Sequence, residues 1–87
     1  MSWQIVFTKQ AQKDAQKIKE AGLKPTVIEL HDILKENPYT ALPPFEKLVG
    51  DLAGAYSRRI NFRHRLVYQI LEEEHIVKVI RMWTHYE

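Results

Sequence analysis

The feature that most constrains the fold of this chain is a change of hydrophobic pattern along its length. In the first half, apolar side chains recur at helical spacing, at Ala11, Ala15 and Ile18 and then at Val27, Leu30, Ile33 and Leu34. From about residue 56 they form short runs rich in Val, Ile, Leu and Tyr instead. Helical spacing indicates amphipathic helices, and β-branched runs indicate strands. The chain is therefore expected to place two helices before most of its strands.

Helix-capping residues, glycine and proline set the expected element boundaries in the first half of the chain. The aromatic and β-branched run at 3–7 predicts a first strand, and Thr8 is suited to cap the helix that follows. Gly22 marks the end of that helix, and Pro25 fits the first turn of the second. The second helix is expected to end at 37–38, an Asn-Pro pair.

The second half is expected to hold a long connection followed by three strands. Residues 39–55 contain prolines and glycines and no sustained period, which is typical of a connection with a function. Strands are predicted at about 56–60, 65–71 and 76–82. The order is β-α-α-β-β-β, an α+β fold in one domain, 1–87. Two N-terminal helices would cover one face of a mostly antiparallel sheet and leave the other face partly open.

Composition narrows the class of protein further. The 87 residues are 45% hydrophobic and 28% charged, a globular balance. Without cysteine the chain has no disulfide, thiolate metal site or cysteine nucleophile. No apolar segment approaches membrane-spanning length and no leader pattern opens the chain, so we expect a cytoplasmic protein with no membrane partner.

The arginines are concentrated in one short stretch. All five arginines lie from Arg58 onward, and four of them fall between Arg58 and Arg65. If this stretch is a hairpin, Arg59 and Arg65 face each other across two strands, where like charges are unfavourable without an anion. That anion could be an acid of the protein, such as Glu46, or the phosphate of a ligand, and the residues alone leave both open. Guanidinium groups suit phosphate because their donors form a fixed fork.

The remaining reactive side chains suit acid–base chemistry. The four histidines have no metal-ligand spacing, no serine lies in a GxSxG motif, and three scattered glycines form no phosphate loop. We therefore expect neither a metal nor a cofactor. Glu46, Arg59, Arg65 and His85 together could cleave a phosphodiester, with a base for the 2′-OH, cations for the phosphorane and an acid for the leaving oxygen. A histidine near the C-terminus is more often an ordinary surface residue, so His85 by itself leaves that alternative open.

Four segments carry a resemblance to a known family. The Pro-Phe-Glu-Lys-Leu run at 44–48, the segment 54–60 with Ser-Arg-Arg-Ile, His-Arg-Leu-Val-Tyr at 64–68 and the terminal His-Tyr at 85–86 resemble the YoeB (Txe) toxins of type II toxin–antitoxin systems. These toxins belong to the RelE/ParE superfamily. The resemblance is strong over residues 42–87 and covers residues 1–40 only in length and pattern.

The resemblance implies a RelE/ParE-like microbial RNase fold and a ribosome-dependent, metal-independent endoribonuclease. Such a toxin, an mRNA interferase, cuts mRNA in the ribosomal A site and inhibits translation. A YefM-type antitoxin neutralises it, and DNA is contacted only through that antitoxin. Whether the free toxin is a homodimer stays open.

The resemblance also implies a role for each site residue. The general base would be Glu46, the phosphate and transition-state clamp Arg65, and the general acid His85, while Tyr86 would position the substrate. Substrate-binding residues would be Arg59, Arg58 and Lys47.

Two departures from the family pattern are visible. Val49 stands where the family often has a lysine, which makes Lys47 the candidate replacement. The chain also has extra residues before His85-Tyr86 and one after it. The chief alternative function is a ParE-like toxin that inhibits DNA gyrase by binding, and a third is an inactive RNA-binding or antitoxin-sequestering module. Neither alternative needs an acid–base set.

Overall fold

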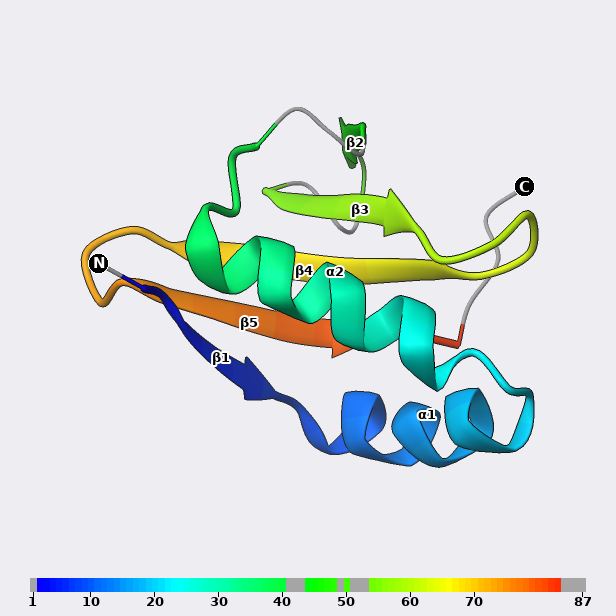
Figure 1. The fold of residues 1–87 in the computed structure, drawn as a ribbon. Helices are drawn as coiled ribbons and strands as arrows, with labels where there is room; N and C mark the ends of the chain where they lie inside the picture. Colours follow the sequence, from blue (N-terminus) through cyan, green and yellow to red (C-terminus); the bar gives the residue numbers. More distant parts are fainter. Residues whose placement is uncertain (1, 41–43, 49, 51–53, 84–87) are drawn as a thin grey trace.

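The fold is a five-stranded sheet with two helices, α+β as the sequence predicts. The computed structural model describes residues 2–40, 44–48, 50 and 54–83. The elements, drawn in Figure 1, are β1 (Gln4–Phe7), α1 (Lys9–Glu20), α2 (Lys24–Glu36), β2 (Phe45–Lys47), β3 (Ala55–Arg59), β4 (Arg65–Leu71) and β5 (Ile76–Arg81). The strand order in the sheet is β1-β5-β4-β3-β2.

Strand pairing is antiparallel except at one edge, where β1 lies parallel to β5. The one addition to the predicted order is β2, which lies inside the expected connection at 39–55 and pairs antiparallel with β3. Three residues are too few to show a hydrophobic period, and β2 is recognisable only by its pairing with β3.

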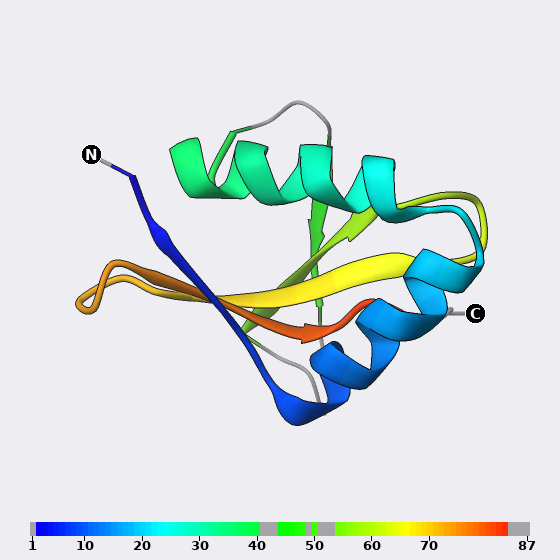
Figure 2. The ribbon, with the colours of Figure 1, turned by 60° about the horizontal axis from the view of Figure 1, so that its bottom comes forward.

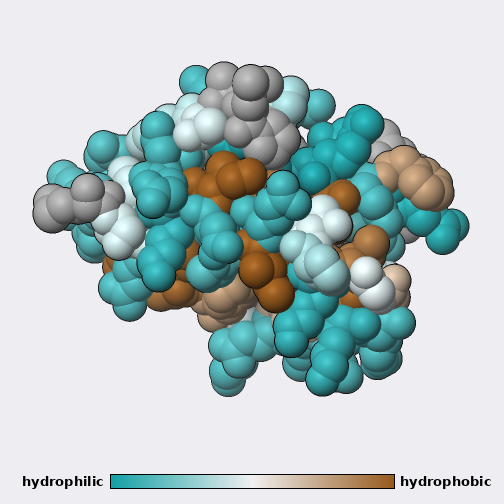
Figure 3. Space-filling model, in the orientation of Figure 1, coloured by the Kyte–Doolittle hydropathy of each residue, from teal (hydrophilic) through white to brown (hydrophobic). Residues whose placement is uncertain are grey.

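Both helices contribute to one core on the same side of the sheet. Buried side chains of α1 and α2 form a single cluster with inward-facing residues of β4 and β5, among them Ile18, Leu34, Leu66, Tyr68 and Val79. Figure 2 shows α2 lying above the sheet and α1 crossing near the end of β5. The outer surface of this side is mostly hydrophilic, with apolar patches between the polar side chains (Figure 3). Within the described residues, no helix combines the length and the apolar character needed to cross a membrane.

The inward face of α1 differs from the expected one at a single position. Ala11 and Ile18 are buried as predicted, but Ala15 is exposed and Asp14 is buried in its place. The reason is a set of hydrogen bonds, because the Asp14 carboxylate accepts the backbone N–H groups of Met82 and Trp83. A buried acid whose partners lie 68 and 69 residues away leaves no trace in a hydrophobic pattern.

Candidate active site

A hollow of about 450 Å³ lies where β2, β3 and β4 run side by side. Three charged side chains line it, one from each strand. The lining residues are Pro44, Glu46, Ser57, Arg59, Ile60 and Arg65. The hollow therefore gathers three of the residues predicted from the sequence to carry chemistry.

Strand register explains why these side chains meet. Arg59 pairs with Arg65 across β3 and β4, which confirms the prediction that the two arginines face each other. Glu46 pairs with Ser57 across β2 and β3. Because alternate residues of a strand share a face, Ser57 and Arg59 lie on the same side of β3. One sheet face thus carries an acid, a hydroxyl and two guanidinium groups.

In this structure the anion beside the arginine pair is Glu46. Its Oε1 lies 3.4 Å from Nη1 of Arg65, as expected if an acid of the protein pairs with the arginines. The Glu46 side chain is 67% exposed, and a solvent-exposed ion pair of this kind contributes only about 0–1 kcal/mol. A phosphate group could displace the carboxylate at small cost. The contact therefore positions Glu46 beside Arg65 without closing the hollow.

Arg58 lies on the other face of β3 and is not brought to the hollow. It is fully buried, and its guanidinium donates to the Tyr68 hydroxyl at 3.0 Å and to the carbonyl oxygens of Pro38 at 3.1 Å and Thr40 at 2.7 Å. The same group lies 4.9 Å from the centre of the Phe45 ring. The structure thus corrects the expectation of a substrate contact, because this side chain tethers the segment after α2 to the sheet.

Lys47 is not brought to the hollow either. It follows Glu46 directly in β2, so the pleat sends the two side chains to opposite faces, and Lys47 pairs with Tyr56. The predicted acid His85 and its neighbour Tyr86 lie outside the described residues.

The turn before Arg65 contacts the end of the described chain. The Asn61 side-chain oxygen accepts the backbone N–H groups of Arg63 and His64, each at 2.8 Å, which holds the turn between β3 and β4. The His64 ring stacks on Trp83 with centroids 3.9 Å apart. Trp83 precedes His85 by two residues. His64, the neighbour of Arg65, therefore contacts the residue that directly precedes the C-terminal segment 84–87.

Ser57 is a site residue that the sequence reasoning did not single out. Its hydroxyl oxygen is buried, lines the hollow, and has no hydrogen-bond partner in the part of the chain that the structure describes. The signal was present in the spacing, because Ser57 stands two residues before Arg59 and must share its face in a strand.

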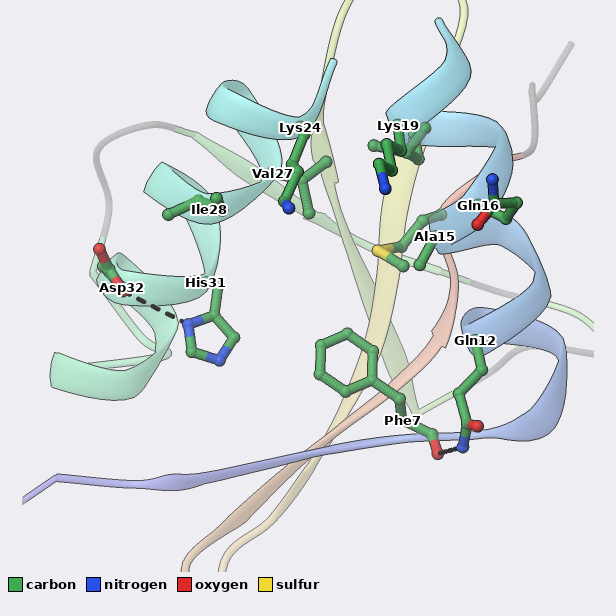
Figure 4. Close-up of a pocket in the computed structure, with 12 residues that line it drawn as sticks. Phe7, Gln12, Ala15, Gln16, Lys19, Lys24, Val27, Ile28, His31 and Asp32 are labelled. Atoms are coloured by element: carbon green, nitrogen blue, oxygen red, sulfur yellow. Dashed lines mark hydrogen bonds and ion pairs between the residues drawn. The ribbon is translucent and has the colours of Figure 1, made fainter. Parts of the chain in front are cut away.

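A larger hollow of about 590 Å³ lies between the two helices. Figure 4 shows the Phe7 and His31 rings facing each other below side chains of α1 and α2, with His31 contacting Asp32. Its lining is mainly apolar, with Ala15, Val27 and Ile28 among the contributing residues. Its cations are Lys19 and Lys24, and it has no arginine among its lining residues, unlike the first hollow. No cluster of three acids or histidines that could hold a metal occurs among the described residues.

Comparison with known proteins agrees with this architecture. A family model for the YoeB-like toxin of bacterial type II toxin–antitoxin systems matches residues 6–86. The YoeB/ParE toxin from Agrobacterium tumefaciens is 30% identical, with a TM-score of 0.85 over 95% of this chain and 99% of its own. A chain of the YoeB-YefM complex from Staphylococcus aureus is 32% identical, with a TM-score of 0.77 over 97% and 98%.

A curated relative gives the same family name. Toxin YoeB of Mycobacterium bovis is 36% identical over 53 residues, which span 61% of this chain and 60% of that relative. These matches confirm the resemblance carried by the motifs. The chain belongs to the YoeB-like toxin family of bacterial type II toxin–antitoxin systems, within the RelE/ParE superfamily.

Proposed function

We propose that this protein is a ribosome-dependent endoribonuclease that cleaves mRNA in the A site and so inhibits translation. The observation that carries the proposal is the hollow in which Glu46, Arg59 and Arg65 converge from three adjacent strands. Family membership supports the choice of RNA as substrate. An inhibitor that acted on gyrase by binding alone would have no use for this convergence.

Cleavage begins with the 2′-OH of the nucleotide before the scissile bond. Incoming phosphate displaces Glu46 from Arg65, and the freed carboxylate removes the 2′-OH proton as general base. The 2′-oxygen then attacks phosphorus, and the added negative charge is stabilised by Arg65, with Arg59 assisting. Arg59 and Arg65 begin as facing like charges, so binding a phosphate between them also relieves their repulsion.

The leaving 5′-oxygen must receive a proton, and His85 is the proposed donor. Breaking the P–O5′ bond then yields a 2′,3′-cyclic phosphate and a free 5′-hydroxyl, with no other reactant needed. Chain length supports this role, because two residues span at most about 7 Å and Trp83 is held against His64, the neighbour of Arg65. Tyr86 is proposed to position the substrate beside His85.

The proposed partners are a YefM-type antitoxin, the ribosome and mRNA. The antitoxin is proposed because the Staphylococcus aureus relative was solved as a YoeB-YefM complex and a Mycobacterium tuberculosis relative, 28% identical, as a RelBE2 toxin-antitoxin complex. A homodimer is a further candidate, since the Staphylococcus aureus toxin was also solved as a YoeB dimer.

Single-turnover cleavage of mRNA on programmed bacterial ribosomes tests the function. Glu46→Gln, Arg65→Ala and His85→Ala should each slow cleavage by about 10²–10⁴-fold, because each removes a proton-transfer group or fixed charge. Arg63→Ala is the matched control, since this exposed arginine belongs to the same hairpin but does not line the hollow. Cleavage by Glu46→Gln and Arg65→Ala at the wild-type rate would overturn the proposal. Growth arrest by these variants without cleavage would favour the gyrase alternative.

A lysine at position 65 tests the geometry of the clamp. Arg65→Lys keeps the charge but loses the planar fork that can hold two phosphate oxygens at once. We expect it to recover only part of the loss in Arg65→Ala and to stay about ten-fold or more below wild type. A lysine variant as fast as wild type would show that charge alone suffices. The same single-turnover assay gives the answer.

A further inference from the structure

We propose that Asp14 is a positioning residue for the C-terminal segment that carries His85 and Tyr86. It acts by holding the backbone at Met82 and Trp83, where the chain leaves the sheet. The inference rests on the function proposed above, because the proposed acid, His85, belongs to the segment that continues from Trp83. Asp14 lies on α1, remote in sequence from every residue assigned to the chemistry.

The hydrogen bonds at Asp14 are directed at one point of the backbone. Oδ2 accepts the N–H groups of Met82 at 3.0 Å and Trp83 at 3.2 Å, just after β5 ends at Arg81. Oδ1 accepts the side-chain amide of Gln10 at 2.9 Å, one turn earlier on α1. Both carboxylate oxygens are thus in use, and the geometry of the acid is set from two sides.

Burial makes this contact unusual for a surface helix. Asp14 is 1% exposed and Met82 is also 1% exposed, so the hydrogen bonds form away from water. An aspartate is almost never fully buried unless its charge is paired or hydrogen-bonded, because desolvation is costly. Hydrogen bonds from N–H groups to a carboxylate are also stronger than those to a neutral acceptor. A water-exposed end of β5 would need no such group.

A second contact restrains Trp83, from the turn between β3 and β4. His64 is 8% exposed, and its ring stacks on the Trp83 ring at an interplanar angle of 20°. The backbone of Trp83 is therefore fixed by α1, and its side chain by the turn that leads into Arg65. Two independent elements converge on the residue from which the segment 84–87 continues. The two contacts together therefore fix the point from which the segment 84–87 continues.

The substitutions Asp14→Ala and Asp14→Asn separate geometry from charge. The Asp14→Asn side chain would keep an oxygen for the two backbone N–H groups, and Gln10 can turn its amide to face the new side-chain amide. We expect Asp14→Asn to cleave within about three-fold of wild type on programmed ribosomes. Asp14→Ala should lower the maximal rate by about ten- to hundred-fold, the loss that a misplacement near 1 Å can cause. The concentration of programmed ribosomes that gives half of the maximal rate should change by less than about two-fold, because Asp14→Ala leaves the surfaces that bind the ribosome in place.

Controls for stability come from the core and from a longer acid. Leu34→Ala removes a fully buried side chain of α2 and should lower the melting temperature. At temperatures where this variant is still folded, it should cleave at the wild-type rate. Asp14→Glu keeps the charge but shifts the carboxylate by one methylene, so it should cleave more slowly than Asp14→Asn. If Asp14→Ala does not fold, this comparison still decides the question. Amide exchange at Met82 and Trp83 should become faster in the variants that cleave slowly.

A double-mutant cycle with His85→Ala identifies the route of the effect. If Asp14 acts through His85, adding Asp14→Ala to His85→Ala should cause almost no further loss of rate. Full additivity would overturn the positioning role, as would an Asp14→Ala rate equal to that of Leu34→Ala. Wild-type cleavage by His85→Ala would instead refute the proposed acid. If His85→Ala is inactive but Asp14→Ala cleaves at the wild-type rate, the positioning role of Asp14 is refuted and the proposed acid is not.

Discussion

Arg58 and Arg59 are adjacent in β3, so the pleat sends their side chains to opposite faces. Arg58 is enclosed in the protein with hydrogen bonds to two backbone carbonyls and a hydroxyl, whereas Arg59 is exposed at the hollow. One arginine therefore stabilises the fold, and the other is available to a ligand.

Alanine at each of these two positions should give opposite outcomes. Arg58→Ala should lower the free energy of unfolding by about 2–4 kcal/mol, because it leaves buried acceptors without their donor. Arg59→Ala should change it by less than about 0.5 kcal/mol while slowing cleavage. Urea unfolding of both variants beside the single-turnover assay checks this. Equal stability losses would mean that the two faces of β3 are not divided in this way.

At the scale of single residues, the sequence predicted those contacts that are set by residues nearby in the chain. Arg59 and Arg65 could be paired in advance because a short hairpin determines which residues face each other. The role of Arg58 could not, since its acceptors at Pro38 and Thr40 lie 20 and 18 residues away in a connection without regular pattern.

Among the elements, the segment after α2 is joined to the turn between β4 and β5 by a Tyr39–Glu72 hydrogen bond. The Tyr39 hydroxyl donates to the Glu72 carboxylate, and its ring packs edge-on against Trp3 at a centroid distance of 6.0 Å. The hydrogen bond to Glu72, with smaller contributions from burial and from the Glu72 charge, raises the pKa of Tyr39 to about 12.

This shift predicts a loss of stability in alkali. Below pH 10 tyrosine is protonated in both the folded and unfolded chains, so the contact contributes fully. As pH rises from about 10 to 12 the unfolded chain loses the proton first, and stability falls. Tyr39→Phe should therefore show a flatter decline in chemical denaturation over this range. Some decline should remain, because burial also raises the pKa of Tyr68. An unchanged slope in Tyr39→Phe would contradict the assignment.

Element boundaries followed the local sequence closely where the signals were local. Thr8 caps α1 through its hydroxyl, and Pro25 stands in the first turn of α2, both as expected. The missed features, β2 and the inward orientation of Asp14, depend on partners in other elements. Their residues carry no period of their own, so no local signal marks them.

For the whole molecule, the parallel β1–β5 pair joins the two ends of the described chain. Thr8 reinforces this closure, because its hydroxyl donates to the Ile80 carbonyl at 2.8 Å and accepts the Ala11 N–H at 3.1 Å. Its own N–H donates to the carbonyl of Val79. One side chain thus caps a helix and ties it to the last strand.

Thr8→Ala should therefore destabilise the protein by more than a cap alone. We expect a loss of about 1–3 kcal/mol, the sum of a helix cap and a second hydrogen bond. Thr8→Ser keeps the hydroxyl and should recover most of that loss, which thermal or urea unfolding can measure. Cleavage per folded molecule should stay within about two-fold, since Thr8 does not line the hollow. A Thr8→Ala variant as stable as wild type would show that the closure does not depend on this residue.

The sequence by itself determined the class of fold, the order of the main elements, the family and the facing of Arg59 and Arg65. The fold class, the element order and the arginine pairing arise from periodicity, capping residues and hairpin geometry, which act over a few residues, whereas the family rests on the resemblance of four short motifs. The tertiary structure decided that Glu46 approaches Arg65, that Arg58 is enclosed, and that Asp14 holds the backbone before the C-terminal segment. Each of these depends on hydrogen bonds or register between segments far apart in the chain, so it exists only once the sheet and helices are packed.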